Sequence, residues 1–432
     1  MTAAADPSVR RSWAPALRVA TICALITMVS QFYRNAHVVV APDIMRDVGV
    51  SAQVLGLLSG ALFVTAAILQ IPAGILLDRY GPRRTIPFML LTVVAGSLLF
   101  ATAQGGTSLV LGRICMGFGV AAIGMAAIVA TTRWYPAAWF ATVVGVLLGL
   151  SQIGNLSATV PMALLSAEIG WRNSYLAVSG ITAVLALASA LFVRDAPDDH
   201  PFHTRTPETL AQAWRGVLEV LAIRDLWPLL VIAGAAFAMI SCILGLWGGP
   251  FLYDMHGLDT TARGSVIFWL AAGMIVGNFT LAPLDRILNT RKRIIVACGL
   301  GTTCVLTALA LQPRMPVFAV TVAFALIGAF SGYTIVIIAH GRSFYPDRLM
   351  GRGVTIVNTA VLAGAGALQG LTGLIAGVLA PGATSLTERD YSIIFATLAA
   401  VLALALFVYR HCPDKPPNAE PERDGAPGIA ES

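Results

Sequence analysis

Charged residues are scarce in this chain of 432 residues, where they make up only 12% of the sequence. In soluble domains, roughly a quarter of all residues are charged, and these residues keep the domain solvated. The hydrophobic fraction of 57% and the mean hydropathy of +0.79 point in the same direction. The composition therefore excludes a soluble protein and indicates that lipid is the main solvent.

Patterns of reactive or metal-binding side chains are also missing. None of the six cysteines forms a Cys-x-x-Cys pair, and all but Cys412 lie inside apolar runs, so we expect neither a disulfide nor a zinc site. The sequence has no nucleotide-binding loop, no metal cluster and no Ser-His-Asp arrangement that its spacing supports. We expect no cofactor, no metal and no enzyme activity.

Apolar runs of about 20 residues or more recur along the whole chain, and each is long enough to cross a bilayer as a helix. The first run is too long for a signal-peptide core, so we expect a span there rather than a cleaved leader. The runs predict an all-α integral membrane protein with twelve transmembrane helices. The predicted spans are 18–42, 52–77, 85–104, 107–130, 138–162, 173–193, 226–252, 263–284, 293–312, 316–340, 352–380 and 391–410.

Basic residues, which give a net charge of +6, gather in alternate loops. If the N-terminus is inside, Arg34 and Arg113 lie within spans and only five of the 28 basic residues fall outside. The positive-inside rule then places both termini in the cytoplasm, and the basic balance requires no nucleic acid. The compact loops indicate that the protein lies in the plasma membrane of a bacterium, which is its inner membrane. The five outside residues are Arg46, Arg172, Arg263, Arg314 and Arg389.

The longest loop separates six spans from six. We expect an N-terminal six-helix half over residues 1–193 and a C-terminal half over 226–410. In the linker, 194–225, apolar residues recur at helical spacing opposite polar ones, which predicts an amphipathic helix on the cytoplasmic face. The tail, 411–432, is rich in Pro, Glu and Ala and is predicted to be disordered. The apolar residues of the linker helix are Leu210, Trp214, Val217, Leu218 and Leu221.

One charged stretch, residues 74–84, lies between the second and third spans. Its charged side chains cannot be buried in the hydrocarbon of the bilayer, so the stretch must be a short loop between two helices. It runs Gly74, three residues, Asp78-Arg79, one residue, Gly81 and then basic residues. This spacing resembles the loop signature of the major facilitator superfamily at every position. The resemblance implies a transporter with two pseudo-symmetric six-helix halves that rock about a central site.

The second half repeats this loop, with leucines in place of both glycines. The resemblance implies that the charges of the two loops hold the cytoplasmic side shut in the outward-open state. Simple positive-inside anchoring is the alternative, and it explains the arginines but not the aspartates. The candidate gating residues are Gly74, Asp78, Arg79, Gly81, Arg83, Asp285, Arg286 and Arg342.

Arg34 is the clearest indication of the substrate, because an arginine near the bilayer centre costs about 2.5–3.5 kcal/mol and usually marks function. Thr27, Gln31 and Arg34, together with His37, fall on one predicted helix stripe. A guanidinium fork suits a carboxylate or a phosphate. The surrounding residues resemble the organophosphate and organic-anion branches of the family, but the seventh span has no second basic residue. We therefore favour a mono- or dicarboxylate; bonding of Arg34 to neighbouring helices alone is the alternative.

Family geometry implies that further polar and aromatic residues lie near the same cavity, although polar side chains in membranes often only join helices. Arg113 would either continue the anion path or tie helices together. His37 is the candidate for proton coupling, because no Asp or Glu lies deep in a predicted span. The candidate substrate-binding residues are Gln31, Tyr33, Arg34, His37, Arg113, Gln152, Asn155, Trp247, Tyr333 and Asn358.

The sequence thus predicts a monomeric secondary or facilitative transporter of a small organic anion, with the lipid bilayer and protons or a counter-transported anion as further partners. One alternative is an exporter of amphiphilic drugs or metabolites, in which Arg34 is structural and aromatic residues form the pocket. The other is a transporter-like sensor that contacts a partner through the linker or the tail. The aromatic residues of the exporter alternative are Phe63, Trp247, Trp269 and Tyr333.

Overall fold

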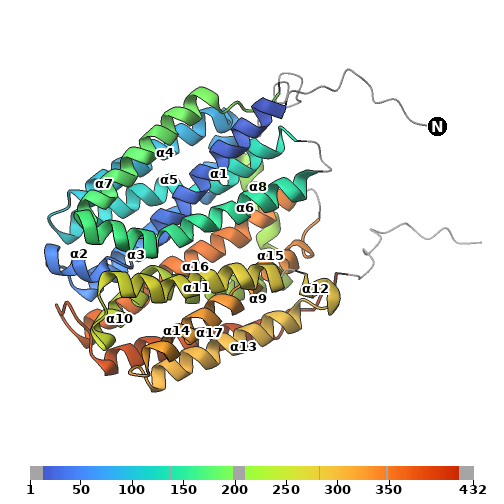
Figure 1. Cartoon of the computed structure of the whole chain (residues 1–432). Helices are drawn as coiled ribbons and strands as arrows, with labels where there is room; N and C mark the ends of the chain where they lie inside the picture. The colour runs from blue at the N-terminus through green and yellow to red at the C-terminus, as the bar shows by residue number, and fades with distance from the viewer. Residues whose placement is uncertain (1–12, 136–138, 198–209, 282, 347–348, 418–432) are drawn as a thin grey trace, which may run out of the picture.

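A computed structural model describes residues 13–135, 139–197, 210–281, 283–346 and 349–417, and all regular structure in these ranges is helical (Figure 1). The first half contains α1 (Trp13–Asn35), α2 (Ala41–Val48), α3 (Ala52–Tyr80), α4 (Pro82–Ala101), α5 (Gly106–Thr132), α6 (Phe140–Ser157) and α7 (Val160–Phe192). Between the halves lies α8 (Leu210–Leu221). The second half contains η4 (Arg224–Leu226), α9 (Trp227–Cys242), η5 (Ile243–Trp247), α10 (Gly248–His256), α11 (Thr260–Leu281), α12 (Leu284–Ile287), α13 (Lys292–Leu311), α14 (Val317–Phe330), α15 (Tyr333–Arg342), α16 (Met350–Leu379) and α17 (Glu388–Tyr409).

Within the described ranges, eleven helical stretches are long and apolar enough to cross a membrane, and one of them, Thr142–Phe192, contains 51 residues. Such a stretch would measure roughly 75 Å, more than twice the ~30 Å hydrocarbon core. It bends at Gly170, whose φ of 77° lies in the left-handed region that favours glycine. The stretch therefore crosses twice, which makes twelve crossings and confirms the predicted fold class.

The helices form two groups that lie side by side (Figure 1). In the first, α4 packs against α5 and α7, and α1 against α6; in the second, α11 packs against α14, and α13 against α17. We call the end of the bundle where α1 begins and α17 ends the terminal side. The opposite end, which carries α2 and α10, is the distal side.

Helices α3 and α16 make the most extensive contact between the two groups, and glycines line it. A Cβ atom on Gly60 would lie 2.7 Å from the carbonyl oxygen of Gly366, and one on Gly56 would collide with the backbone of Gly373. Small residues let membrane helices approach until their backbones touch. The two halves are therefore in close backbone contact in the distal part of the bundle.

Four of the predicted spans are interrupted. The fifth of the twelve spans breaks at residues 158–159, between α6 and α7. The first ends at Asn35, before a turn and the short helix α2, and the seventh passes through a π-helical segment, η5. The tenth is divided into α14 and α15. Single-turn π-helical segments often mark functional sites. All four breaks lie inside predicted spans, for each of which the sequence predicts one continuous helix.

In the linker, α8 lies beside α16. Gly216, Val217 and Val220 are buried, whereas Trp214 and Leu218 are 49% and 62% exposed. One edge of this helix therefore presents apolar side chains away from the bundle.

Candidate functional site

The exposure of side chains on α1 decreases from the start of the helix toward Arg34. Leu17 and Leu25 are 64% and 40% exposed, and Gln31 and Arg34 farther along the helix are half-buried. The residues that follow, 35–42, are buried. Accessibility therefore decreases along α1 and ends at the level of Arg34.

Arg34 has no counter-charge in the part of the chain that the structure describes. Its Nε atom is buried without a hydrogen-bond partner, and its guanidinium forms no ion pair or hydrogen bond with a described residue. Its backbone carbonyl oxygen accepts a hydrogen bond from Arg113 at 3.4 Å. An uncompensated cation inside a membrane protein is costly. Because the Arg34 guanidinium is already partly desolvated, binding an anion adds little desolvation cost for the arginine.

Neutral polar side chains lie on both sides of the interface between the two halves, near Arg34. Asn35 of α1 donates to Asn155 Oδ1 of α6 at 2.8 Å, and Asn155 donates to Gln152 Oε1 at 2.6 Å. From the other half, Gln369 of α16 donates to the carbonyl oxygen of Ser241 at 2.6 Å and keeps an unpartnered Oε1 atom. This group supplies hydrogen-bonding atoms without charge on both sides of the interface.

Gly245, in the π-helical segment η5, lies where these side chains meet. A Cβ atom there would stand 3.1 Å from Asn35 Oδ1 and 3.2 Å from Gln369 Nε2. It would also be 3.8 Å from the carbonyl oxygen of Arg34. The glycine therefore allows α1 and α16 to approach the same turn of the seventh span.

Arg113 of α5 is fully buried and binds backbone. Its Nε and Nη1 atoms donate to the carbonyl oxygens of Leu58 and Tyr33 at 3.2 and 2.6 Å, and Nη2 donates to that of Arg34. All three nitrogen atoms thus already have acceptors. The geometry favours the helix-tying alternative for this residue, because α1, α3 and α5 meet at one guanidinium.

His37 lies past the end of α1, in the turn before α2, and not on a continuous helical stripe with Arg34 as predicted. It is fully buried, with Nε2 2.7 Å from Ser59 Oγ. Because Ser59 donates its only hydroxyl proton to the carbonyl of Leu55, Nε2 must be the donor in this pair. Nδ1 has no partner.

The other predicted substrate-binding residues do not converge on Arg34 in the described contacts. The Tyr33 hydroxyl pairs with Thr182 at 3.1 Å inside the first half, and Trp247 donates to Thr372 at 2.9 Å inside the second. Tyr333 is buried with an unpartnered hydroxyl. Asn358 lies half-buried on α16, eleven residues before Gln369 and therefore about three turns toward the terminal side.

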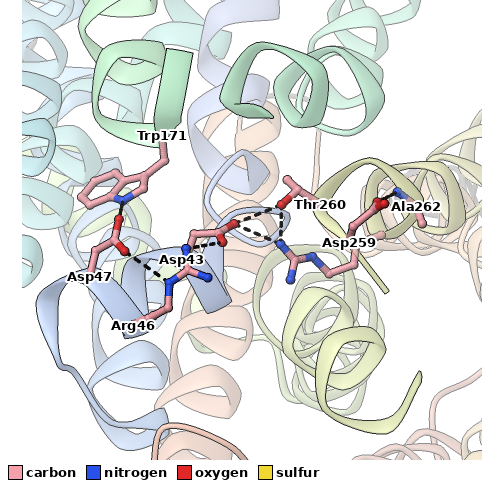
Figure 2. Close-up of polar contacts among 8 residues, drawn as sticks. Asp43, Arg46, Asp47, Trp171, Asp259, Thr260 and Ala262 are labelled. Carbon is pink, nitrogen blue, oxygen red and sulfur yellow. Dashed lines mark hydrogen bonds and ion pairs between the residues drawn. The ribbon is translucent and has the colours of Figure 1, made fainter. Parts of the chain in front are cut away.

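The distal side is closed by an ion pair between the halves (Figure 2). Asp43 of α2 lies 3.0 Å from Arg263 of α11 and accepts a hydrogen bond from Thr260 at 3.2 Å. The Arg263 side chain is only 1% exposed. Arg46 pairs with Asp43 at 3.2 Å from the same helix, and Asp47 accepts from the Trp171 indole at 3.0 Å. The sequence analysis missed this pair, although both residues adjoin short loops on the same predicted side.

On the terminal side, α3 and α4 are joined by one residue, Gly81, with a φ of 75°. A side chain there would be strained and would collide with the carboxylate of Asp195, which follows α7. Asp195 also accepts the backbone N–H of Arg83 at 2.8 Å and, through its carbonyl, a bond from Arg133 at 3.4 Å. Gly74 has only Met125 nearby. The signature loop is therefore anchored within its own half by an aspartate that the motif does not include.

The remaining predicted gating residues do not pair across the halves in the described contacts. Asp285 is buried and lies 3.4 Å from Arg291 of its own half. Arg79 lies over the ring of Tyr80 and is exposed, as are Arg286 and Arg342. The side chain of Asp78 lies outside the described part of the structure.

Beyond α17, the chain turns back onto the terminal end of α13. Asp414 accepts the backbone N–H groups of Arg291 and Lys292 at 3.3 and 3.2 Å and the hydroxyl of Thr290 at 2.6 Å. Its carboxylate therefore caps α13. Partial burial alone would raise the pKa of this carboxyl, but the hydrogen bonds from Thr290 and the two N–H groups hold the pKa below its usual value.

Relatives with known names transport anions or confer drug resistance. The chain is 25% identical over 287 residues to the hexuronate transporter of Bacillus subtilis (strain 168), covering 63% of this chain and 68% of that protein. It is 28% identical over 284 residues to the nitrate/nitrite transporter NrtP of Picosynechococcus sp., covering 59% and 50%. It is also 27% identical over 191 residues to the quinolone resistance transporter of Acinetobacter baumannii, covering 43% and 42%. The last two matches span about half of those proteins or less.

The fold is also similar to that of solved transporters. A bacterial homologue of the human lysosomal transporter Spinster, crystallised in an inward-facing and unoccupied conformation, superposes with a TM-score of 0.72. The two chains are 18% identical, and the match covers 94% of this chain and 97% of the other. At this identity, the likeness concerns the fold alone.

The sequence model of the Major Facilitator Superfamily matches residues 23–369, which include Arg34, the signature loop and all the interface glycines named above except Gly373. The chain therefore belongs to the Major Facilitator Superfamily of membrane transporters.

Proposed function

We propose that the protein is a secondary or facilitative transporter of a small organic anion that carries a carboxylate, and that Arg34 binds the carboxylate. The unpaired guanidinium of Arg34 is the observation that carries this proposal. The hexuronate transporter among the relatives supports it, since a hexuronate is a hydroxylated carboxylate.

The residues around Arg34 also support a hydroxylated anion. Gln152, Asn155 and Gln369 offer uncharged donors and acceptors, which suit hydroxyl groups. The seventh span, Trp227–His256, has no Lys or Arg, so one guanidinium carries the charge recognition. A single carboxylate matches one guanidinium better than a doubly charged phosphate does.

In the proposed cycle, the anion neutralises Arg34 and makes closure of the site less costly. Burial of an unpaired charge costs several kcal/mol, and a paired charge costs less. With both termini in the cytoplasm, as the positive-inside count predicts, the terminal side faces the cytoplasm. The pair of Asp43 and Arg263 then joins the two halves on the external side.

A thermal-shift measurement on purified protein tests the anion site, because a ligand that binds only the folded state raises the unfolding midpoint. Glucuronate and glucose form a matched pair that differs in the carboxylate at carbon 6. Nitrate, a phosphate ester and a neutral amphiphile complete the panel. The Arg34→Gln variant removes the charge, and Arg18→Gln is the control, because Arg18 lies on the same helix near the terminal end.

We expect a small carboxylate to raise the midpoint of the wild type and of Arg18→Gln, and glucose to have no effect. Arg34→Gln should lose the shift. An equal shift in Arg34→Gln would refute the proposed role of Arg34. A ligand that shifts the midpoint but is not transported into proteoliposomes would favour the sensor alternative.

An exporter of amphiphilic compounds is the second candidate, and the quinolone resistance transporter among the relatives favours it. The described ring contacts do not gather its four proposed aromatics: Phe63 pairs with Phe237, and Trp247 with Tyr391. Trp269 is 54% exposed on α11. A shift with the neutral amphiphile alone, unchanged in Arg34→Gln, would select this function.

A further inference from the structure

A groove of about 850 Å³ lies between α13 and α17, in the distal half of the second group of helices. Its volume is in the range of small-molecule sites, roughly 300–1,000 Å³. Alanines and threonines form most of its lining, and Arg389 and Glu388 lie at its distal end. The lining residues used below are Thr307, Ala396, Ala400 and Ala403.

The groove arises because α13 and α17 contact each other closely at one end only. Toward the terminal side they touch at Gly299, where a Cβ atom would lie 2.7 Å from a methyl group of Leu406. Toward the distal side, α17 presents Ala396, Ala400 and Ala403, which are exposed and too small to fill the space. These exposed alanines lie within a helix that has the length and composition of a membrane span, so the groove faces the acyl chains of the bilayer.

Two arginines lie near the distal end of the groove, and they differ. Arg314 forms an ion pair with Glu388 at 3.1 Å. Arg389 is exposed and forms no ion pair or hydrogen bond with any residue in the described ranges. An arginine at this level of a membrane span lies at the lipid headgroups, where its guanidinium can pair with a lipid phosphate. The groove thus has an apolar body and one uncompensated positive charge at its headgroup end.

We propose that this groove binds one anionic phospholipid, with its phosphate at Arg389 and an acyl chain along the alanines of α17. The site is separate from Arg34 and does not depend on the proposed substrate. A second copy of this chain is a less suitable occupant. In a two-fold interface, the same patch meets itself, so two unpaired Arg389 side chains would face each other without counter-charge.

Native mass spectrometry of the purified protein in detergent tests the site, using dioleoylphosphatidylglycerol and dioleoylphosphatidylcholine at equal concentrations. The two lipids have the same acyl chains and differ in headgroup charge. Arg389→Gln removes the charge, and Ala400→Trp fills the groove from its exposed side. Arg314→Gln is the control, because Arg314 is already paired.

We expect one phosphatidylglycerol to bind the wild type about fivefold more tightly than phosphatidylcholine, the effect of one basic residue at a charged membrane surface. Arg389→Gln should remove this preference, Ala400→Trp should remove binding of both lipids, and Arg314→Gln should retain both. Lipid binding that is unchanged in Arg389→Gln and Ala400→Trp would overturn the proposal. A dimer that is lost in Ala400→Trp would also overturn it and assign the groove to a second copy.

Discussion

Arg34 and Arg113 are both arginines within apolar runs, yet their surroundings differ. Arg113 donates to three backbone carbonyl oxygens, whereas the guanidinium of Arg34 has no partner among the described residues. The first is therefore a structural cross-link between helices and the second a candidate ligand site.

Replacement of Arg113 by Gln should destabilise the fold without a specific effect on the ligand. Three buried carbonyl groups, of Tyr33, Arg34 and Leu58, would lose their donor, and each unsatisfied group costs about 1–3 kcal/mol. We expect a loss of at least about 2 kcal/mol, seen as a lower unfolding midpoint without ligand. A variant with the wild-type midpoint and weaker anion binding would instead place Arg113 in the substrate path.

At the residue scale, the sequence revealed the two intramembrane charges because they interrupt apolar runs. It could not show which one is free, because the partners of Arg113 are main-chain carbonyls, which every residue has. The neutral polar side chains around Gly245 also form no sequence motif, because their arrangement depends on where α1, α9 and α16 cross.

The ion pair between α2 and α11 connects two short elements that come from different halves. We expect Asp43→Asn to shift the equilibrium toward a distal-open state, because Arg263 would remain buried without its counter-charge. The side chain of Asp43 is 21% exposed. We therefore expect the substitution to destabilise the distal-closed state by about 2 kcal/mol, at the low end of the range for a broken charge pair. This corresponds to about thirtyfold in the equilibrium constant.

The distance between spin labels at Gln104→Cys and Gln312→Cys, on the distal loops of the two halves, measures this shift in a background without the native cysteines. Arg46→Gln is the matched control, since its 67% exposed side chain pairs only within the first half. The exchange of Asp43→Arg with Arg263→Asp should restore closure. Distances that remain unchanged in Asp43→Asn would show that the ion pair does not hold the distal side shut.

The segment that follows α17 gives a pH-dependent stabilisation. The pKa of Asp414 in the folded protein lies below the ordinary 3.8, so its contribution is fully present above that value and is lost as the pH falls through the folded pKa. Asp414→Asn keeps a side-chain acceptor for α13 but loses the charge. We expect it to lower stability by about 1 kcal/mol at pH 6.

Unfolding midpoints of the wild type and of Asp414→Asn between pH 6 and pH 3 test this expectation. The difference should narrow as the pH falls below about 4, where the wild-type carboxyl becomes protonated. A constant difference over this interval would mean that the charge of Asp414 does not stabilise the folded state.

At the element scale, the twelve spans could be predicted because each exceeds the length that a bilayer requires. The breaks after Asn35 and at η5 could not be predicted, because both lie inside runs that are long enough for one continuous span. Tertiary contacts determine such breaks. For example, Val38 lies so close to Gly249 that a Cβ atom on Gly249 would collide with the Val38 carbonyl. The cap that Asp414 forms on α13 is likewise invisible in sequence, since 122 positions separate it from Lys292.

At the scale of the whole molecule, the halves touch along the distal part of α3 and α16 and at the Asp43–Arg263 pair. Transport requires the halves to rock so that access to Arg34 alternates between the two sides. Under the proposed function, a bound anion should favour this motion, because it would remove the unpaired charge from the interface.

Uptake of a radiolabelled anion into proteoliposomes tests the central claim most directly. The anion is the one with the largest thermal shift, and the wild type is compared with Arg34→Gln and Arg18→Gln at equal protein content. A charge-assisted hydrogen bond contributes about 1.5–3 kcal/mol, so Arg34→Gln should raise the half-saturating concentration at least tenfold or abolish uptake. Arg18→Gln should behave as the wild type. Uptake by Arg34→Gln at the wild-type rate and half-saturation would contradict the account.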